Sequence, residues 1–158
     1  MKKKLSHLSE DKVRDLAKEI LGFYDTETAQ SGVGQLTSFT QLGFKGVKDR
    51  PDGWYLPNEK CFPAIILETK SGNTILKQEH IDELLKNCRI AQKKYAHVIG
   101  ILYNGDDIIV FKDEIRLENE TELRNKEHYL GLYAENSIDK QKIYNLTKRI
   151  NDSLHYDF

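Results

Sequence analysis

An aspartate, a glutamate and a lysine stand at a spacing that could bind a divalent metal ion and hydrolyse a phosphate ester. Glu68 and Lys70 are two positions apart in an apolar run that predicts a strand, so both project from the same face. A register that pairs Trp54 with Ile66 places Asp52 opposite Glu68. Directly opposite residues have Cβ atoms about 4.5–5.5 Å apart. Two carboxylates that close repel each other, so a cation is expected beside them.

The identity of that cation determines the chemistry. Oxygen ligands favour Mg²⁺, with Mn²⁺ as a substitute, and Mg²⁺ commonly takes one or two carboxylates together with water and substrate phosphate. Such an ion polarises a phosphate and lowers the pKa of bound water. Lys70 would orient or deprotonate the attacking water, or neutralise charge on the phosphorus. The bare pattern also arises by chance, so a solvated or salt-bridged strand face is the alternative.

Hydrophobic periodicity predicts the elements that must position these residues. Ser9 is a suitable N-cap for the first helix, and Asn104-Gly105-Asp106-Asp107 is typical of a hairpin turn. The order of elements predicts an α/β fold. The predicted elements are a helix over 10–24, strands over 36–42, 52–56 and 64–70, a helix over 78–97, strands over 98–103 and 108–112, and a helix over 138–154.

Length and composition limit the class of protein. The chain has 158 residues, which predicts one domain, with a core over 9–112, an acidic connector over 113–137 and a C-terminal helix over 138–158. Its 24 Lys and Arg against 25 Asp and Glu exclude a global basic field, so any nucleic-acid site must be local. No apolar run approaches the ~20 residues of a membrane-spanning helix. The 2 cysteines lack metal-ligand spacing, and we expect a reduced, cytoplasmic protein with no membrane partner.

The segments Arg50-Pro51-Asp52-Gly53-Trp54 and Glu68-Thr69-Lys70 together resemble the motif of the PD-(D/E)xK nuclease superfamily. More narrowly, roughly residues 9–112 resemble the amino-terminal nuclease domain of type I restriction subunits and of fused restriction–modification (adenine methylase) enzymes. The resemblance implies a restriction-endonuclease-like fold, in which a central mixed sheet is flanked by helices (an αβββαβ core). It also implies a metal-dependent DNA endonuclease domain of a restriction–modification system, acting on double-stranded DNA.

The resemblance assigns roles to the residues of this motif. Asp52 and Glu68 would bind Mg²⁺, and the carbonyl of Thr69 would complete the protein's share of the coordination. Lys70 would be the catalytic cation.

Two further residues would assist from the helices. An early acid on the first helix is implied, and Glu10, at the edge of the apolar stripe, is favoured over Glu19 on the far side. A glutamate in a first turn also stabilises the helix dipole, which is the alternative interpretation of Glu10. On the second helix, Gln78 is expected on the inward face, where it would order the metal's waters. Asp82 stands where many relatives carry a tyrosine.

Basic residues in two places predict contacts with the DNA backbone. Such contacts position a duplex without reading its sequence. A row of charges along a helix is more often only a solvated face, so this prediction is the weaker one. The residues are Lys45, Lys48 and Arg50, just before the motif, and Lys86, Arg89 and Lys93, along the second helix.

Target choice is expected to lie on further domains or subunits of a restriction–modification enzyme. The chain has no Gly-x-x-x-x-Gly-Lys phosphate loop and no methyltransferase signature, and its last helix is expected to lead into a further domain. One alternative is a free-standing nuclease such as a junction resolvase. Another is a non-catalytic module for DNA docking or subunit assembly, which the acidic span 113–139 favours.

Overall fold

The structure of the chain, a computed structural model, describes residues 8–21, 29–31, 37–119, 121–122 and 125. The predicted helix over 138–154 and nearly all of the acidic connector lie outside these residues. The described helices are too short and too polar to cross a membrane. The described elements are α1 (Glu10–Leu21), β1 (Ala29–Ser31), β2 (Gly53–Tyr55), β3 (Ala64–Thr69), α2 (Gln78–Gln92), β4 (Val98–Tyr103), β5 (Ile108–Lys112) and β6 (Ile115–Arg116).

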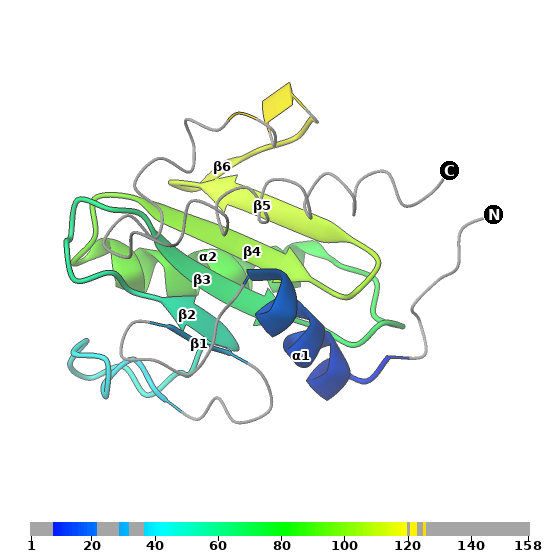
Figure 1. Cartoon of the computed structure of the whole chain (residues 1–158), viewed down its shortest axis with the longest axis horizontal. Helices are drawn as coiled ribbons and strands as arrows, with labels where there is room; N and C mark the ends of the chain where they lie inside the picture. The colour runs from blue at the N-terminus through cyan, green and yellow to red at the C-terminus, as the bar shows by residue number, and fades with distance from the viewer. Residues whose placement is uncertain (1–7, 22–28, 32–36, 120, 123–124, 126–158) are drawn as a thin grey trace.

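The strands form one mixed sheet in the order β1-β2-β3-β4-β5-β6. β3 and β4 are parallel, and the other neighbouring strands are antiparallel. A parallel pair needs a crossover connection, and α2 provides it between β3 and β4 (Figure 1). The predicted α/β class, a mixed sheet flanked by helices, is therefore confirmed.

Within the described residues, α1 packs on one face of the sheet and α2 on the other. Ile65 and Leu67 of β3 belong to a buried cluster that includes the inner side of α1, whereas Ala64 and Ile66 belong to a second cluster with α2. All four side chains are 0% exposed. At Gly100 of β4 the sheet and α2 come very close, because an added Cβ would lie only 2.6 Å from the sulfur of Cys88. The end of β3 thus lies between two helices.

Both predicted hairpins are present. Trp54 of β2 pairs with Ile66 of β3, which is the register expected from the sequence. Between β4 and β5, the side-chain oxygen of Asn104 accepts hydrogen bonds from the backbone N–H groups of Asp106 at 2.9 Å and Asp107 at 2.6 Å. Gly105 takes a φ of 98° in this turn, a conformation that glycine adopts without strain.

The strand predicted over 36–42 is wrong in its described part. Residues 39–43 form a turn. The backbone N–H groups of Phe39 and Thr40 donate hydrogen bonds to the carbonyls of Asp49 and Val47, both at 2.9 Å. Gly43, with a φ of 97°, reverses the chain here, and β1 at Ala29–Ser31 is the strand that pairs with β2.

The second helix is shorter than the predicted span of 78–97. It ends at Gln92, and the following residues form a turn. Tyr95 is buried all the same, and its hydroxyl donates a hydrogen bond of 2.7 Å to the carbonyl of Pro57. The apolar pattern therefore continues past the helix because the turn packs against the same core.

Candidate active site

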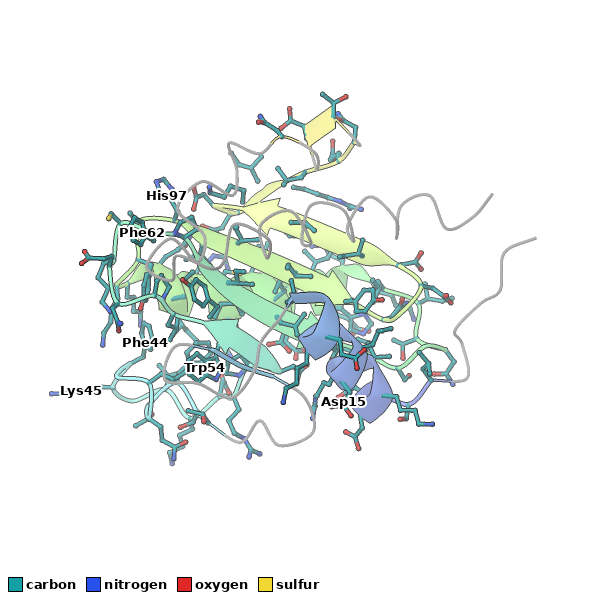
Figure 2. The ribbon with its side chains drawn as sticks, viewed as in Figure 1. Asp15, Phe44, Lys45, Trp54, Phe62 and His97 are labelled. Carbon is teal, nitrogen blue, oxygen red and sulfur yellow. The ribbon has the colours of Figure 1, made fainter. Side chains whose placement is uncertain are left out.

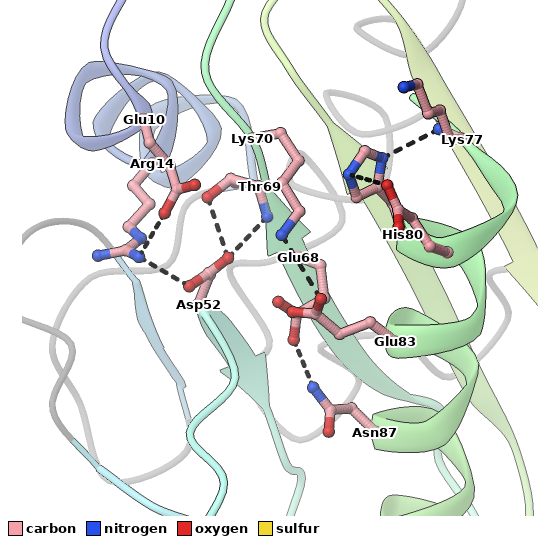
Figure 3. Close-up of polar contacts among 11 residues, drawn as sticks. Glu10, Arg14, Asp52, Glu68, Thr69, Lys70, Lys77, His80, Glu83 and Asn87 are labelled. Atoms are coloured by element: carbon pink, nitrogen blue, oxygen red, sulfur yellow. Dashed lines mark hydrogen bonds and ion pairs between the residues drawn. The ribbon is translucent and has the colours of Figure 1, made fainter. Parts of the chain in front are cut away.

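The hairpin of β2 and β3 brings the predicted acidic pair together. Gly53 of β2 lies opposite Leu67 of β3, so Asp52 and Glu68 are the next pair of residues along the hairpin. The backbone N–H of Asp52 donates to the carbonyl of Leu67 at 3.1 Å, which keeps the two segments side by side beyond the last strand pair. Figure 3 shows both carboxyl groups at this end of the hairpin, between α1 and α2.

The carboxylate of Asp52 is held from two sides. Its Oδ2 atom accepts hydrogen bonds from the backbone N–H of Thr69 at 2.8 Å and from the Thr69 hydroxyl at 3.1 Å. Its Oδ1 atom lies 3.0 Å from Nη2 of Arg14 on α1. The carboxylate of Asp52 therefore points toward Thr69 and α1, and not only toward the sheet face that carries Glu68. Thr69 acts here as a donor, and its carbonyl as a metal ligand stays a prediction.

Glu10 joins the site through Arg14. The same Nη2 atom of Arg14 lies 2.9 Å from Oε2 of Glu10, one helical turn away. The Glu10 side chain is 41% exposed and that of Arg14 is 22% exposed. Glu19 is exposed and has no contact with these residues in the described part of the chain. Of the two first-helix acids weighed from the sequence, Glu10 is the one beside the site.

Glu68 is buried, with only 3% of its surface exposed. Its Oε1 atom accepts a hydrogen bond of 2.5 Å from the side-chain amide of Asn87 on α2. Burial raises the pKa of Glu68 well above its ordinary value, and the negative charge of Asp52 raises it further, while the bond from Asn87 acts in the opposite direction. A nearby cation would stabilise the charged form of such a carboxyl group. Strongly shifted pKa values of this kind are typical of functional sites.

Lys70 follows β3 and lies at the same end of the hairpin. Its backbone N–H donates to the carbonyl of Tyr103 at 3.0 Å, which anchors it to β4. Its ammonium group lies 3.5 Å from a carboxylate oxygen of Glu83 on α2 (Figure 3). The side chain is 21% exposed, so the ammonium is restrained but accessible to a ligand.

The prediction for Gln78 is wrong in its orientation. Its side chain is exposed and donates a hydrogen bond of 2.9 Å to Asp82, instead of facing inward. Gln78 is the first residue of α2, and the buried stripe of that helix begins one turn later, at Ile81. The first turn therefore extends past the part of the helix that packs on the sheet.

Sequence reasoning missed three residues of the site: Arg14, Glu83 and Asn87. Arg14 lies next to the buried residue Val13, and Asn87 is a buried amide on the inward stripe of α2. Arg14 stands four positions after Glu10, and Asn87 stands four positions after Glu83. This spacing was a usable signal, because residues four apart lie on one helix face.

The predicted DNA-contacting residues fall into two groups. Lys45, Lys48 and Arg50 are exposed in the segment that leads into β2, and Figure 2 shows Lys45 projecting away from the molecule. On α2, Lys86 and Arg89 are already in ion pairs, with Asp49 at 2.9 Å and Glu114 at 2.6 Å. Lys93 directly follows the end of α2 and is exposed. Among the described residues, less of the charge of the first group is neutralised by ion pairs.

The donors at this site fit one hard divalent cation. Asp52 and Glu68 offer carboxylate oxygens close together, and the raised pKa of Glu68 arises from burial and from a nearby negative charge, both of which a cation would offset. In the described part of the chain, no three His, Cys, Asp or Glu side chains converge as metal ligands. An Mg²⁺ ion held by two carboxylates takes its other ligands from water, carbonyls and substrate.

A scan against protein-family models and searches of curated proteins and of solved structures find no significant match to the chain. The function must therefore be argued from the chemistry of the site. That chemistry combines an oriented carboxylate, a buried carboxyl group of raised pKa and a lysine two residues further along the chain.

Proposed function

We propose that this chain is a metal-dependent DNA endonuclease domain of a restriction–modification system, built on a restriction-endonuclease-like fold. The observation that carries the proposal is the meeting of Asp52 and Glu68 at the end of β3, with Lys70 two residues after Glu68. The resemblance of 50–54 and 68–70 to the PD-(D/E)xK motif supports the same assignment.

Some residues of the site would bind the metal, and Lys70 would act on the water and the phosphate. Asp52 and Glu68 would hold Mg²⁺ or Mn²⁺, which when bound supplies a polarised phosphate and a water of lowered pKa. Asn87 fixes one oxygen of Glu68, and Thr69 fixes one oxygen of Asp52, so both carboxylates are oriented in advance. The ammonium of Lys70 can orient the attacking water or stabilise the negative charge that builds on the phosphate oxygens.

The duplex would be positioned by the exposed basic segment before β2. Lys45, Lys48 and Arg50 lie on the stretch that runs directly into Asp52, so phosphate groups bound there are delivered toward the acidic pair. Lys86 and Arg89 would contribute less, because their own ion pairs must be broken first. Partners of this domain would be double-stranded DNA and the further domains or subunits that select the target.

The first test is Mg²⁺ binding by calorimetry, with plasmid nicking measured on the same samples. Binding by the wild-type chain should be lost in both Asp52→Ala and Glu68→Ala. Glu59→Ala is the matched control, because it removes an equal charge from an exposed turn between β2 and β3. If the wild type binds neither Mg²⁺ nor Mn²⁺, with or without DNA, the nuclease assignment is wrong.

One observation favours a second candidate, a non-catalytic module for DNA docking or subunit assembly. The charges of the site already have partners within the chain, since Arg14 neutralises Asp52 and Glu83 lies beside Lys70. A module of this kind predicts no metal at Asp52 and Glu68, and unchanged DNA binding in Lys70→Ala. The nuclease predicts a bound metal and, in that variant, loss of nicking with the metal still bound.

A further inference from the structure

We propose that Arg14 is a built-in cation of the site, which occupies Asp52 in the resting protein and competes with a divalent metal for it. The inference rests on the proposed function, because it takes Asp52 to be a metal ligand. It adds a residue outside the acidic motif that sets how tightly the metal binds.

The position of the guanidinium group carries the argument. A single nitrogen of Arg14, Nη2, lies 3.0 Å from Oδ1 of Asp52 and 2.9 Å from Oε2 of Glu10. It therefore bridges two carboxylates from different elements, as a metal ion between them would. The other oxygen of Asp52 already accepts two hydrogen bonds from Thr69. A metal that binds Asp52 must therefore share Oδ1 with Arg14 or displace Arg14 from that oxygen.

The burial of Arg14 shows that these two acids fix its position. The side chain is 22% exposed, and its Nε atom is buried with no hydrogen-bond partner among the described residues. The outer end of the guanidinium group thus holds its place through the contacts with Asp52 and Glu10, together with Asp11 at 3.7 Å. A second cation that needs the same carboxylate oxygens will therefore weaken the binding of the guanidinium group to them.

Removing the charge of Arg14 should therefore tighten metal binding. The change frees an oxygen of Asp52 and removes a positive charge that repels the incoming ion at close range. For charges a few ångströms apart at a partly exposed site, we expect Mn²⁺ to bind at least about tenfold more tightly. Mn²⁺ alone is the probe, because its binding can be followed by calorimetry and by electron paramagnetic resonance without DNA or turnover.

The experiment compares four versions of the chain. Arg14→Gln should bind Mn²⁺ at least about tenfold more tightly than the wild type, whereas Arg14→Lys, which keeps the charge, should stay near the wild-type affinity. Lys12→Gln is the matched control, because Lys12 is exposed on the same helix and its loss changes the net charge equally. Arg14→Met repeats the test if glutamine disturbs folding, which circular dichroism would detect.

A double variant separates competition at Asp52 from a general change of charge. Asp52→Asn keeps an amide oxygen but loses the negative charge that Arg14 and the metal share, so Mn²⁺ binding should be much weaker. The weak binding that remains at Glu68 should change far less with Arg14→Gln than the wild-type binding does. A wild-type chain that binds Mn²⁺ through Asp52 and Glu68, but with an affinity that Arg14→Gln leaves unchanged or lowers, overturns this inference alone. Absence of Mn²⁺ binding in every version overturns both the inference and the proposed function.

Discussion

The two helices meet the same end of β3, but each supplies its carboxylate with a different kind of partner. On the α1 side, the partly exposed Arg14 forms an ion pair with Asp52 at 3.0 Å. On the α2 side, Asn87 is 5% exposed and donates an uncharged hydrogen bond to Glu68. The difference follows from burial, because a charged partner on the drier side would have to be desolvated together with the acid.

The two carboxyl groups therefore differ in how far the chain compensates their charge. Arg14 places a positive charge beside Asp52, and a metal at the proposed site would have to compete with it. The partner that α2 gives Glu68 is the neutral amide of Asn87. Burial, and after it the charge of Asp52, raises the pKa of Glu68, so its charged form lacks full compensation. If the site binds a metal as proposed, the α2 side would attract the cation, and Arg14 on the α1 side would oppose its binding to Asp52.

The strongest way to break the contrast is to remove the neutral partner on the α2 side. Asn87→Ala leaves a buried carboxyl group without its donor, and we expect the free energy of unfolding to fall by about 1–3 kcal/mol. Urea unfolding followed by circular dichroism measures it. Asn73→Ala is the control, because Asn73 is exposed. The Asn73 side chain accepts a hydrogen bond from the Ser71 hydroxyl at 2.6 Å, so an equal loss in both variants would show that the buried bond of Asn87 stabilises the fold no more than an exposed one.

The second test asks whether Glu68 opposes folding at high pH. Because its pKa is raised in the folded protein, the stability that Glu68 contributes is fully present below its ordinary pKa and is lost as the pH rises through the folded value. Glu68→Gln removes this loss and keeps an oxygen for Asn87 to bond. We expect the variant to be more stable than the wild type at pH 8 by at least about 1 kcal/mol.

Unfolding curves at pH 4 and pH 8 check this prediction. The advantage of Glu68→Gln should shrink at pH 4, where the wild-type carboxyl group is also neutral. An advantage that is equal at both pH values would mean that packing, and not charge, distinguishes the two side chains. Asp106→Asn, in the turn after β4, is the control for an acid outside the site.

The sequence was informative where the structure depends on local pairing. The turn between β2 and β3 and the alternation of apolar residues determine which residue faces which, so the pairing of Trp54 with Ile66, and with it the approach of Asp52 to Glu68, could be predicted. The same reasoning could not find β1. Ala29–Ser31 has no marked strand preference, and its pairing with β2 makes it a strand.

The contribution of α2 shows why helix faces are harder to predict. Periodicity predicts the buried stripe of a helix, but where the helix sits along the strand depends on packing. Gly100 lets α2 approach β4 so closely that Cys88 fills the space of a side chain, and this places Asn87 over Glu68. Gln78, in the first turn of the same helix, is exposed and donates to Asp82 instead of facing the sheet.

The smallest expected effect sharpens the contrast from the exposed side. Glu10→Gln removes one of the carboxylates that hold Arg14, yet Glu10 is 41% exposed, so solvent screens the pair. We expect the free energy of unfolding to change by about 0.2–1 kcal/mol, and less in high salt. Urea unfolding at low and high salt measures both. Because the Asp52 contact remains, Arg14 should stay in place. If Glu10→Gln lowered the free energy of unfolding as much as Asn87→Ala does, the contacts of α1 at the site would be as important for stability as those of α2. The contrast between the two helices would then fail.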